Sequence, residues 1–174
     1  MPRPSPNALS LSHRVLSILI PLNFAAGLLI LALLIASIVA RDWVFYALGV
    51  HGVLKGGGLV AGMRAIMVIG IAAVPLVNVI LRRLLAMVET VRDGNAFVPE
   101  NAQRLKRIAW SVLGLEIMHA VVAAIAKAVS TQTVPIDIHW DLNVTRWLVV
   151  LLLFVLAQVF EEGTRMRADL EGTV

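Results

Sequence analysis

The chain has 174 residues, of which 59% are hydrophobic and 15% charged, and its formal net charge is +4. An average soluble domain has roughly 25% charged residues, so this chain has too few polar side chains to cover a water-soluble surface. The composition excludes an ordinary soluble globular protein and a disordered chain, and it leaves an all-α membrane protein with several spans. Cysteine is absent, which excludes disulfides, a thiolate metal site and a cysteine nucleophile.

Four apolar stretches are long enough to cross a bilayer, which takes about 20 residues. They are residues 15–40, 65–81, 108–126 and 142–160. The first is much longer than the roughly 7–15 apolar residues of a signal peptide, so we expect it to be retained as a helix. The second extends back through Leu59 if the Arg64 side chain reaches water. The sequence therefore predicts one four-helix transmembrane domain over residues 1–174, with small outer loops.

The distribution of Lys and Arg predicts the orientation of the four spans. The N-terminal segment, the middle loop 82–107 and the C-terminal tail together hold ten basic residues, whereas loops 41–64 and 127–146 hold five. Because cytoplasmic loops carry the excess of basic residues, we expect both termini and the middle loop to be cytoplasmic. The expected location is the bacterial inner (cytoplasmic) membrane.

The middle loop has the pattern of a helical hairpin rather than of a connector. Leucine and valine recur at helical spacing up to Val91, so the second helix should continue to about Arg92. Gly94 suits a left-handed helix end and Pro99 the first turn of a new helix. About eleven residues at 1.5 Å each would carry the hairpin about 16 Å into the cytoplasm. Glu100 and Arg104 are spaced to pair on its second arm.

The basic residues of this hairpin are candidates for docking a cytoplasmic partner or anionic lipid; the alternative is that they only set topology and touch lipid. The candidates are Arg82, Arg83, Arg92, Arg104, Lys106 and Arg107.

Several short motifs resemble a family of small bacterial four-helix membrane proteins of unknown function. They lie within residues 81–85, 91–94, 97–102 and 104–108, and at the end of the chain within 155–160 and 169–174. Because members are often encoded beside a small helix-turn-helix transcription regulator, the resemblance implies a membrane-bound regulatory pair. The family has no assigned catalytic residue to carry over.

Glu116 is the one acidic residue within a predicted span, and His119 follows it on the same helical face. An acidic residue at a helix centre costs about 2.5–3.5 kcal/mol to insert, so the pair could form a proton-responsive or ligand-binding site. The alternative is a neutral or internally paired Glu that holds helices together. A single Glu-x-x-His motif lacks the second half of a di-metal site, and we expect no metal and no cofactor.

The third loop contains a short alternating segment, residues 135–141, that is typical of a strand. Asp137, His139 and Asp141 would share one face of it and, with His51, could bind a divalent cation. The alternative is a solvated polar face. Motifs typical of hydrolases, zinc proteases and phosphate loops are absent, so we expect no enzymatic activity.

Two functions follow from these patterns as hypotheses. The first is a sensor or anchor that binds a cytoplasmic partner such as a helix-turn-helix regulator. The alternative is a small proton-coupled transporter that uses Glu116. The expected partners are the lipid bilayer, the regulator and, for a homo-oligomer, a second copy of the chain; direct binding of nucleic acid is not expected.

Overall fold

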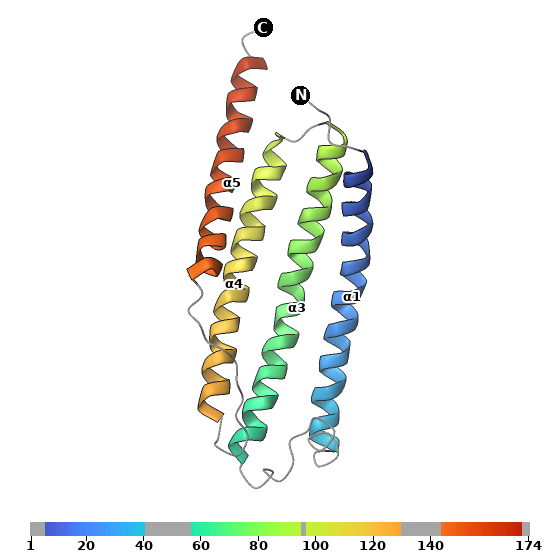
Figure 1. The fold of residues 1–174 in the computed structure, drawn as a ribbon, viewed down its shortest axis with the longest axis vertical. Helices are drawn as coiled ribbons and strands as arrows, with labels where there is room; N and C mark the ends of the chain where they lie inside the picture. Colours follow the sequence, from blue (N-terminus) through green and yellow to red (C-terminus); the bar gives the residue numbers. More distant parts are fainter. Residues whose placement is uncertain (1–5, 41–56, 95–96, 130–143, 172–174) are drawn as a thin grey trace. The chain divides into compact units, whose positions relative to one another are not determined.

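A computed structural model describes residues 6–40, 57–94, 97–129 and 144–171, and these parts of the chain are helical. The helices are α1 (Pro6–Val39), α3 (Gly57–Arg92), α4 (Pro99–Val129) and α5 (Val144–Glu171), shown in chain order from blue to red in Figure 1. The described residues contain no strand. The short strand predicted at 135–141 lies outside the described residues.

All four helices are long and apolar enough to cross a membrane, which confirms the predicted number of candidate spans. These stretches are Ser10–Val39, Gly58–Arg92, Pro99–Val129 and Val144–Met166. The shortest has 23 residues, or about 35 Å of helix, against about 30 Å of hydrocarbon. The helices run beyond the predicted spans 15–40, 65–81, 108–126 and 142–160 at most ends, because amphipathic turns continue past the uncharged runs.

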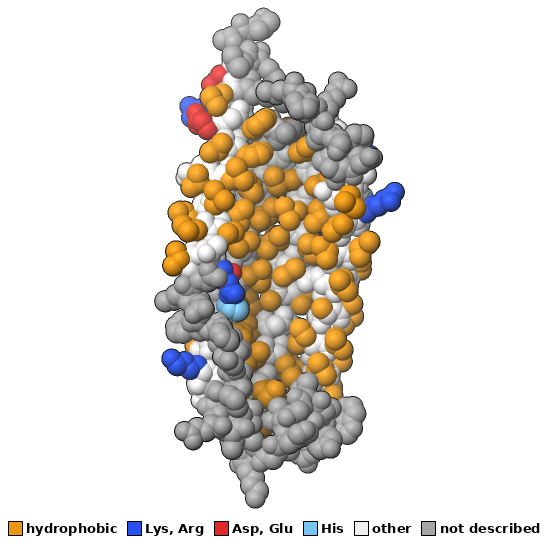
Figure 2. Space-filling model, viewed as in Figure 1, with side chains coloured by type: hydrophobic (Ala, Val, Ile, Leu, Met, Phe, Trp, Pro, Cys, Tyr) orange, Lys and Arg blue, Asp and Glu red, His pale blue; other side chains and the backbone are white. Residues whose placement is uncertain are grey.

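Apolar side chains cover most of the described surface on the face shown in Figure 2. Only 6% of the most apolar window is buried in each of α1 and α3, and 22% in α4. Exposed side chains include Leu28, Leu29 and Leu152, each above 60%. Contiguous apolar surface of this kind is rare on soluble monomers, and it is what lipid-facing helices require.

The predicted ends of the hairpin helices are confirmed. α3 ends at Arg92, and the backbone N–H groups of Asp93 and Gly94 donate to the carbonyls of Glu89 and Val91 at 3.0 and 3.1 Å. Gly94 has φ +82°, a conformation that glycine adopts without a steric cost. Pro99 opens α4, where its missing N–H is not needed.

The helices contribute to two compact units. One contains Met1–Leu22, Leu76–Gly114 and Asn143–Val174, and the other contains Asn23–Pro75 and Leu115–Leu142. We call the first the hairpin unit and the other the second unit.

In the hairpin unit, α5 packs on α4 and on Phe97, two residues before α4 begins, through two aromatic pairs. Phe97 stacks on Phe160 and Trp110 meets Phe154 edge to face, both with ring centroids 5.3 Å apart. Gly163 allows the close approach, since an added Cβ there would lie 3.3 Å from Phe97 Cδ1. The buried apolar side chains of these helices include Ala102, Leu105, Ile108 and Ala109 of α4 and Val150 and Ala157 of α5.

In the second unit, glycines bring the helices together. A Cβ added at Gly27 of α1 would lie 2.8 Å from Val74 Cγ2 of α3, and one at Gly62 of α3 would lie 2.5 Å from Val129 Cγ1 of α4. Asn23 Nδ2 also donates to the Val74 carbonyl at 3.0 Å. Close backbone approach at small residues, together with polar side chains bonded across helices, is how helices associate within membranes.

Candidate functional site

A buried polar network joins the two arms of the α3–α4 hairpin (residues 82–107). The side chain of Asn101, on α4, is fully buried, and its Nδ2 donates to Thr90 Oγ1 of α3 at 2.8 Å. The Thr90 hydroxyl in turn donates a hydrogen bond to the Met87 carbonyl at 2.8 Å. Because unpaired polar groups are costly to bury, these bonds fix how α4 is rotated against α3.

Arg104 completes this network from the next turn of α4. Its Nη1 donates to Asn101 Oδ1 at 2.8 Å and to the Ala86 carbonyl of α3 at 3.1 Å. The predicted ion pair between Glu100 and Arg104 is wrong: the two side chains are described, and no ion pair joins them. Arg104 instead bonds to Asn101 Oδ1 and to the Ala86 carbonyl, which are more buried than the Glu100 carboxylate. Charge-assisted hydrogen bonds are stronger in such a setting.

A small polar hollow of about 160 Å³ opens beside Arg104. Arg83 of α3 and Arg104 and Arg107 of α4 line it, together with Glu100 and Gln103. The fold therefore brings Arg83 of α3 to the same place as Arg104 and Arg107, which are neighbours on α4. The hollow carries three formal positive charges against one negative charge, which makes it a candidate anion site.

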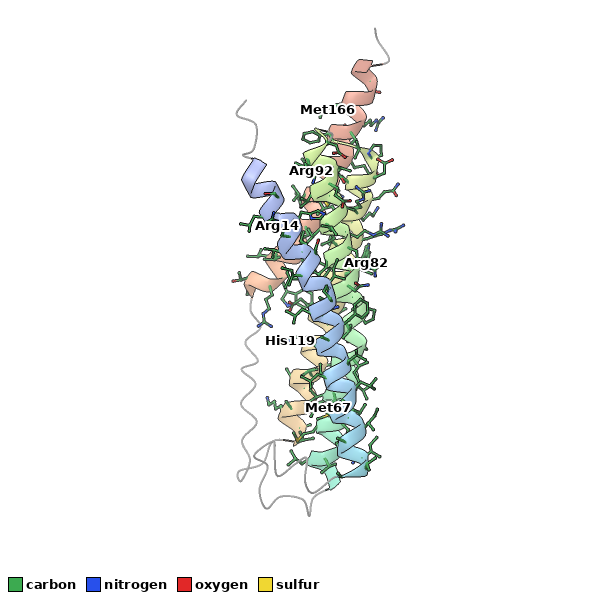
Figure 3. The ribbon with its side chains drawn as sticks, turned by 90° about the vertical axis from the view of Figure 1, so that its right-hand side faces the viewer. Arg14, Met67, Arg82, Arg92, His119 and Met166 are labelled. Atoms are coloured by element: carbon green, nitrogen blue, oxygen red, sulfur yellow. The ribbon has the colours of Figure 1, made fainter. Side chains whose placement is uncertain are left out.

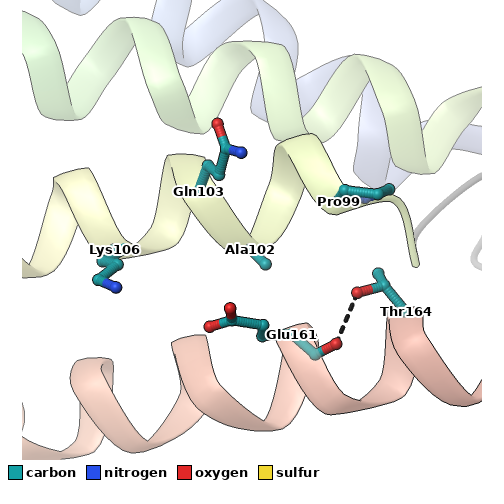
Figure 4. Close-up of a pocket in the computed structure, with 6 residues that line it drawn as sticks. All are labelled: Pro99, Ala102, Gln103, Lys106, Glu161 and Thr164. Atoms are coloured by element: carbon teal, nitrogen blue, oxygen red, sulfur yellow. Dashed lines mark hydrogen bonds between the residues drawn. The ribbon is translucent and has the colours of Figure 1, made fainter.

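A larger groove of about 270 Å³ lies between α4 and α5. Figure 4 shows Lys106 and Ala102 on the side of α4 that faces α5, with Glu161 and Thr164 opposite, while the Gln103 side chain turns the other way. The Thr164 hydroxyl donates to the Glu161 carbonyl at 2.7 Å. The exposed Lys106 and Glu161 give the groove one charge of each sign.

The remaining predicted docking residues lie along α3. Figure 3 labels Arg82 and Arg92 on this helix, and both side chains are exposed. Arg82 Nε donates to Asn78 Oδ1 at 3.2 Å, one turn earlier. The six predicted residues thus separate into three at the hollow, Lys106 at the groove, and two exposed on α3.

Glu116 and His119 lie one turn apart on α4, as their spacing predicts, and both side chains are half-buried. Within the described part of the chain neither makes a hydrogen bond or an ion pair, and no group of three or more potential metal ligands is found. The proposed cation site at His51, Asp137, His139 and Asp141 lies outside the described residues.

Two polar contacts were not anticipated from the sequence. His13 Nε2 of α1 lies 3.6 Å from Glu89 Oε1 of α3. Arg64, whose position in an extended second span would require its side chain to reach water, is half-buried; it donates from Nη2 to the Ser37 carbonyl and from Nε to Ser37 Oγ at 3.3 Å. Because a cation favours the negative C-terminal end of a helix, the arginine stabilises the last turn of α1. Nothing in the linear pattern near Arg64 points to Ser37.

Comparison with known families identifies the chain at the level of family. Residues 42–174 match the model for proteins of unknown function DUF2975. The chain belongs to the DUF2975 family. The match covers α3, α4 and α5, and thus every lining residue of the hollow and the groove. The resemblance noted from the sequence is confirmed, since DUF2975 is a family of unknown function and this chain has four apolar helices. No curated protein matches the chain, and no solved structure matches it.

Proposed function

We propose that this protein is a non-enzymatic sensor or anchor of the bacterial inner membrane. Its α3–α4 hairpin would face the cytoplasm and hold a soluble partner, for which a helix-turn-helix transcription regulator is the leading candidate. The regulator is proposed because the chain resembles proteins that are often encoded beside a helix-turn-helix regulator. The excess of basic residues around the hairpin and at both termini supports the cytoplasmic orientation.

The observation that carries the proposal is the buried Asn101 side chain with its partners on α3. A loop that only connects two spans needs no such network, because exposed connecting residues satisfy their polar groups with water. Here the network rigidifies a segment that presents exposed charged side chains such as Arg92 and Lys106. A pre-organised charged surface favours binding because less ordering is required when the partner arrives.

The groove between α4 and α5 is the surface proposed for the partner. Lys106 and Glu161 lie on opposite sides of it, so a partner that carries a matching pair of charges would be held in one register. The hairpin supplies one wall and the charged half of α5 the other.

Sidedness is the first test, and the absence of cysteine makes it direct. We expect Asp93→Cys to react with a membrane-impermeant maleimide only in inverted membrane vesicles, and Lys127→Cys only in right-side-out vesicles. Both residues are exposed at described helix ends. Labelling of Asp93→Cys from outside would overturn the cytoplasmic placement of the hairpin.

Partner binding is tested with membranes that contain the full chain and with the purified regulator encoded beside its gene. Arg92→Glu/Lys106→Glu should lower retention of the regulator in the membrane fraction at least tenfold. Arg14→Glu/Arg165→Glu reverses two exposed charges on α1 and α5 and should leave retention within twofold. Equal retention with both double variants, or none with the unaltered protein, would refute partner docking.

The alternative function, proton-coupled transport, depends on Glu116. Its half-buried position on an apolar helix is compatible with that role, since ionisable groups within membranes often mark ion pathways. No hydrogen bond or ion pair to a described residue ties it to a structural role.

A further inference from the structure

We infer that the hollow lined by Arg83, Arg104 and Arg107 is a binding site for the phosphodiester headgroup of an anionic phospholipid, with phosphatidylglycerol as the best fit. The inference does not depend on partner docking, because the three arginines that carry it line the hollow and not the α4–α5 groove; of the lining residues, Gln103 is shared by both.

The position of the hollow along the helices places it at the edge of the hydrocarbon. Arg83 lies two residues after the uncharged run 65–81, and Arg107 directly precedes the uncharged run 108–115. At 1.5 Å per residue these arginines lie within about 3 Å of the apolar boundary. The headgroup layer occupies roughly the next 5–8 Å. Trp110, one turn from Arg107 and 60% exposed, has the amphipathic ring that prefers this layer.

The chemistry of the lining favours a phosphodiester. Guanidinium groups bind phosphate oxygens through two parallel N–H donors, and they are less strongly hydrated than ammonium groups. The Gln103 side chain can add a neutral donor. A volume of about 160 Å³ corresponds to roughly five water molecules at about 30 Å³ each. This is enough for a phosphate and part of its substituent.

The hollow is built before any ligand arrives. Nη1 of Arg104 is held by Asn101 Oδ1 and by the Ala86 carbonyl, so this guanidinium is fixed by the same network that closes the hairpin. Arg83 and Arg107 approach the hollow from α3 and α4, respectively. A fixed donor loses little freedom on binding, which separates this hollow from scattered basic residues on a surface.

Glu100 selects among phospholipids. Its carboxylate lines the hollow and can accept hydrogen bonds from a hydroxyl or an ammonium group, but it offers nothing to a trimethylammonium group. The lining has a net charge of two positive units, which favours an anionic lipid over a zwitterionic one. A phosphodiester that carries glycerol hydroxyls satisfies both conditions, and phosphatidylglycerol has this composition.

The test is native mass spectrometry of the purified full-length protein in detergent, titrated separately with phosphatidylglycerol, phosphatidylcholine and inorganic phosphate. We expect phosphatidylglycerol to bind at least tenfold more tightly than phosphatidylcholine, and inorganic phosphate to compete only weakly. Arg83→Gln/Arg107→Gln should weaken phosphatidylglycerol binding at least tenfold, because it removes two of the three guanidinium groups.

The matched control is Arg14→Gln/Arg165→Gln, which removes the same charge. Arg14 directly precedes the uncharged run 15–40, so its depth matches that of Arg107. The double variant should bind phosphatidylglycerol with an affinity within twofold of that of the unaltered protein. Circular dichroism and size-exclusion profiles check that each variant is folded. A preference for phosphatidylglycerol that survives Arg83→Gln/Arg107→Gln would overturn the site. Equal affinity for phosphatidylcholine would refute recognition of an anionic headgroup, and tight binding of inorganic phosphate would assign the site to a soluble anion.

The two proposals fail separately. Loss of lipid binding with Arg83→Gln/Arg107→Gln together with normal retention of the regulator would support the headgroup site alone. Loss of the regulator with Arg92→Glu/Lys106→Glu and unchanged lipid binding would support partner docking alone.

Discussion

Asn101 Nδ2 donates to Thr90 Oγ1 across 2.8 Å, and this bond joins α4 to α3 between residues only eleven positions apart in the sequence. Arg104 bonds to the same amide from the other side, through Asn101 Oδ1. The fully buried Asn101 side chain therefore serves both as the link between two helices and as the support of an arginine at the polar hollow.

Removing this link should destabilise the protein. Asn101→Ala removes the hydrogen bonds that Thr90 and Arg104 make to the Asn101 side chain, and we expect the free energy of unfolding to fall by about 1–3 kcal/mol. Reversible unfolding in mixed micelles, followed by tryptophan fluorescence, measures the change. Gln103→Ala, at an exposed neighbouring position, should change the free energy by less than about 0.5 kcal/mol. Equal stability of the two variants would show that the network is not stabilising.

Two glycines of α3 should respond oppositely to the same substitution. A Cβ at Gly62 would lie 2.5 Å from Val129 Cγ1, whereas one at Gly58 meets nothing within 4 Å. Gly62→Ala should cost about 1–3 kcal/mol through overpacking, and Gly58→Ala should be neutral or stabilise by up to about 1 kcal/mol. Thermal stability in detergent distinguishes them. A stable Gly62→Ala variant would show that α3 and α4 separate at this point without cost.

The stack between Phe97 and Phe160, with centroids 5.3 Å apart, should be energetically coupled. A double-mutant cycle with Phe97→Leu and Phe160→Leu is expected to give a coupling energy of about 0.5–1.5 kcal/mol. Strict additivity of the two single variants would contradict a direct contribution of the stack to docking of α5.

Arg64 should be more important for stability than an exposed arginine. Arg64→Gln removes the charge-assisted bond to the Ser37 carbonyl, and we expect a loss of about 1.5–3 kcal/mol. Arg14→Gln, at an exposed position of α1, should have an effect below about 0.5 kcal/mol. Similar behaviour of both variants would mean that Arg64 does not stabilise the end of α1.

Glu116→Gln separates the sensor or anchor from the transporter. The amide keeps the shape of the side chain but cannot ionise. If the protein is a sensor or anchor, the variant should retain the regulator at the membrane. Proton uptake by proteoliposomes should then stay at the level of protein-free vesicles for both the variant and the unaltered protein. Uptake by the unaltered protein that is lost in Glu116→Gln would favour transport instead.

Helix number and the ends of the hairpin could be predicted because they depend on local signals. Gly94 and Pro99 carry their conformational preferences in any context, and long uncharged runs identify candidate spans. The partners of Asn101 could not be predicted, because they depend on how α4 is rotated against α3. Contacts between helices also explain why the predicted pair of Glu100 and Arg104 is wrong. Their spacing favours an ion pair on an isolated helix, but Arg104 bonds to the Ala86 carbonyl of α3 instead.

The sequence separations of these contacts imply an order of assembly during synthesis. Closing the loop between Thr90 and Asn101, which are eleven positions apart, has a small entropic cost, whereas the pairing of Phe97 with Phe160 requires all of α4 and more than half of α5 to be synthesised. The hairpin can therefore form while α5 is still in the ribosome. The groove between Lys106 and Glu161 comes into being only when α5 arrives. A chain truncated before α5 could then occupy the membrane and still offer no α4–α5 groove to a partner, so the surface proposed for docking would form only after α5 has been synthesised.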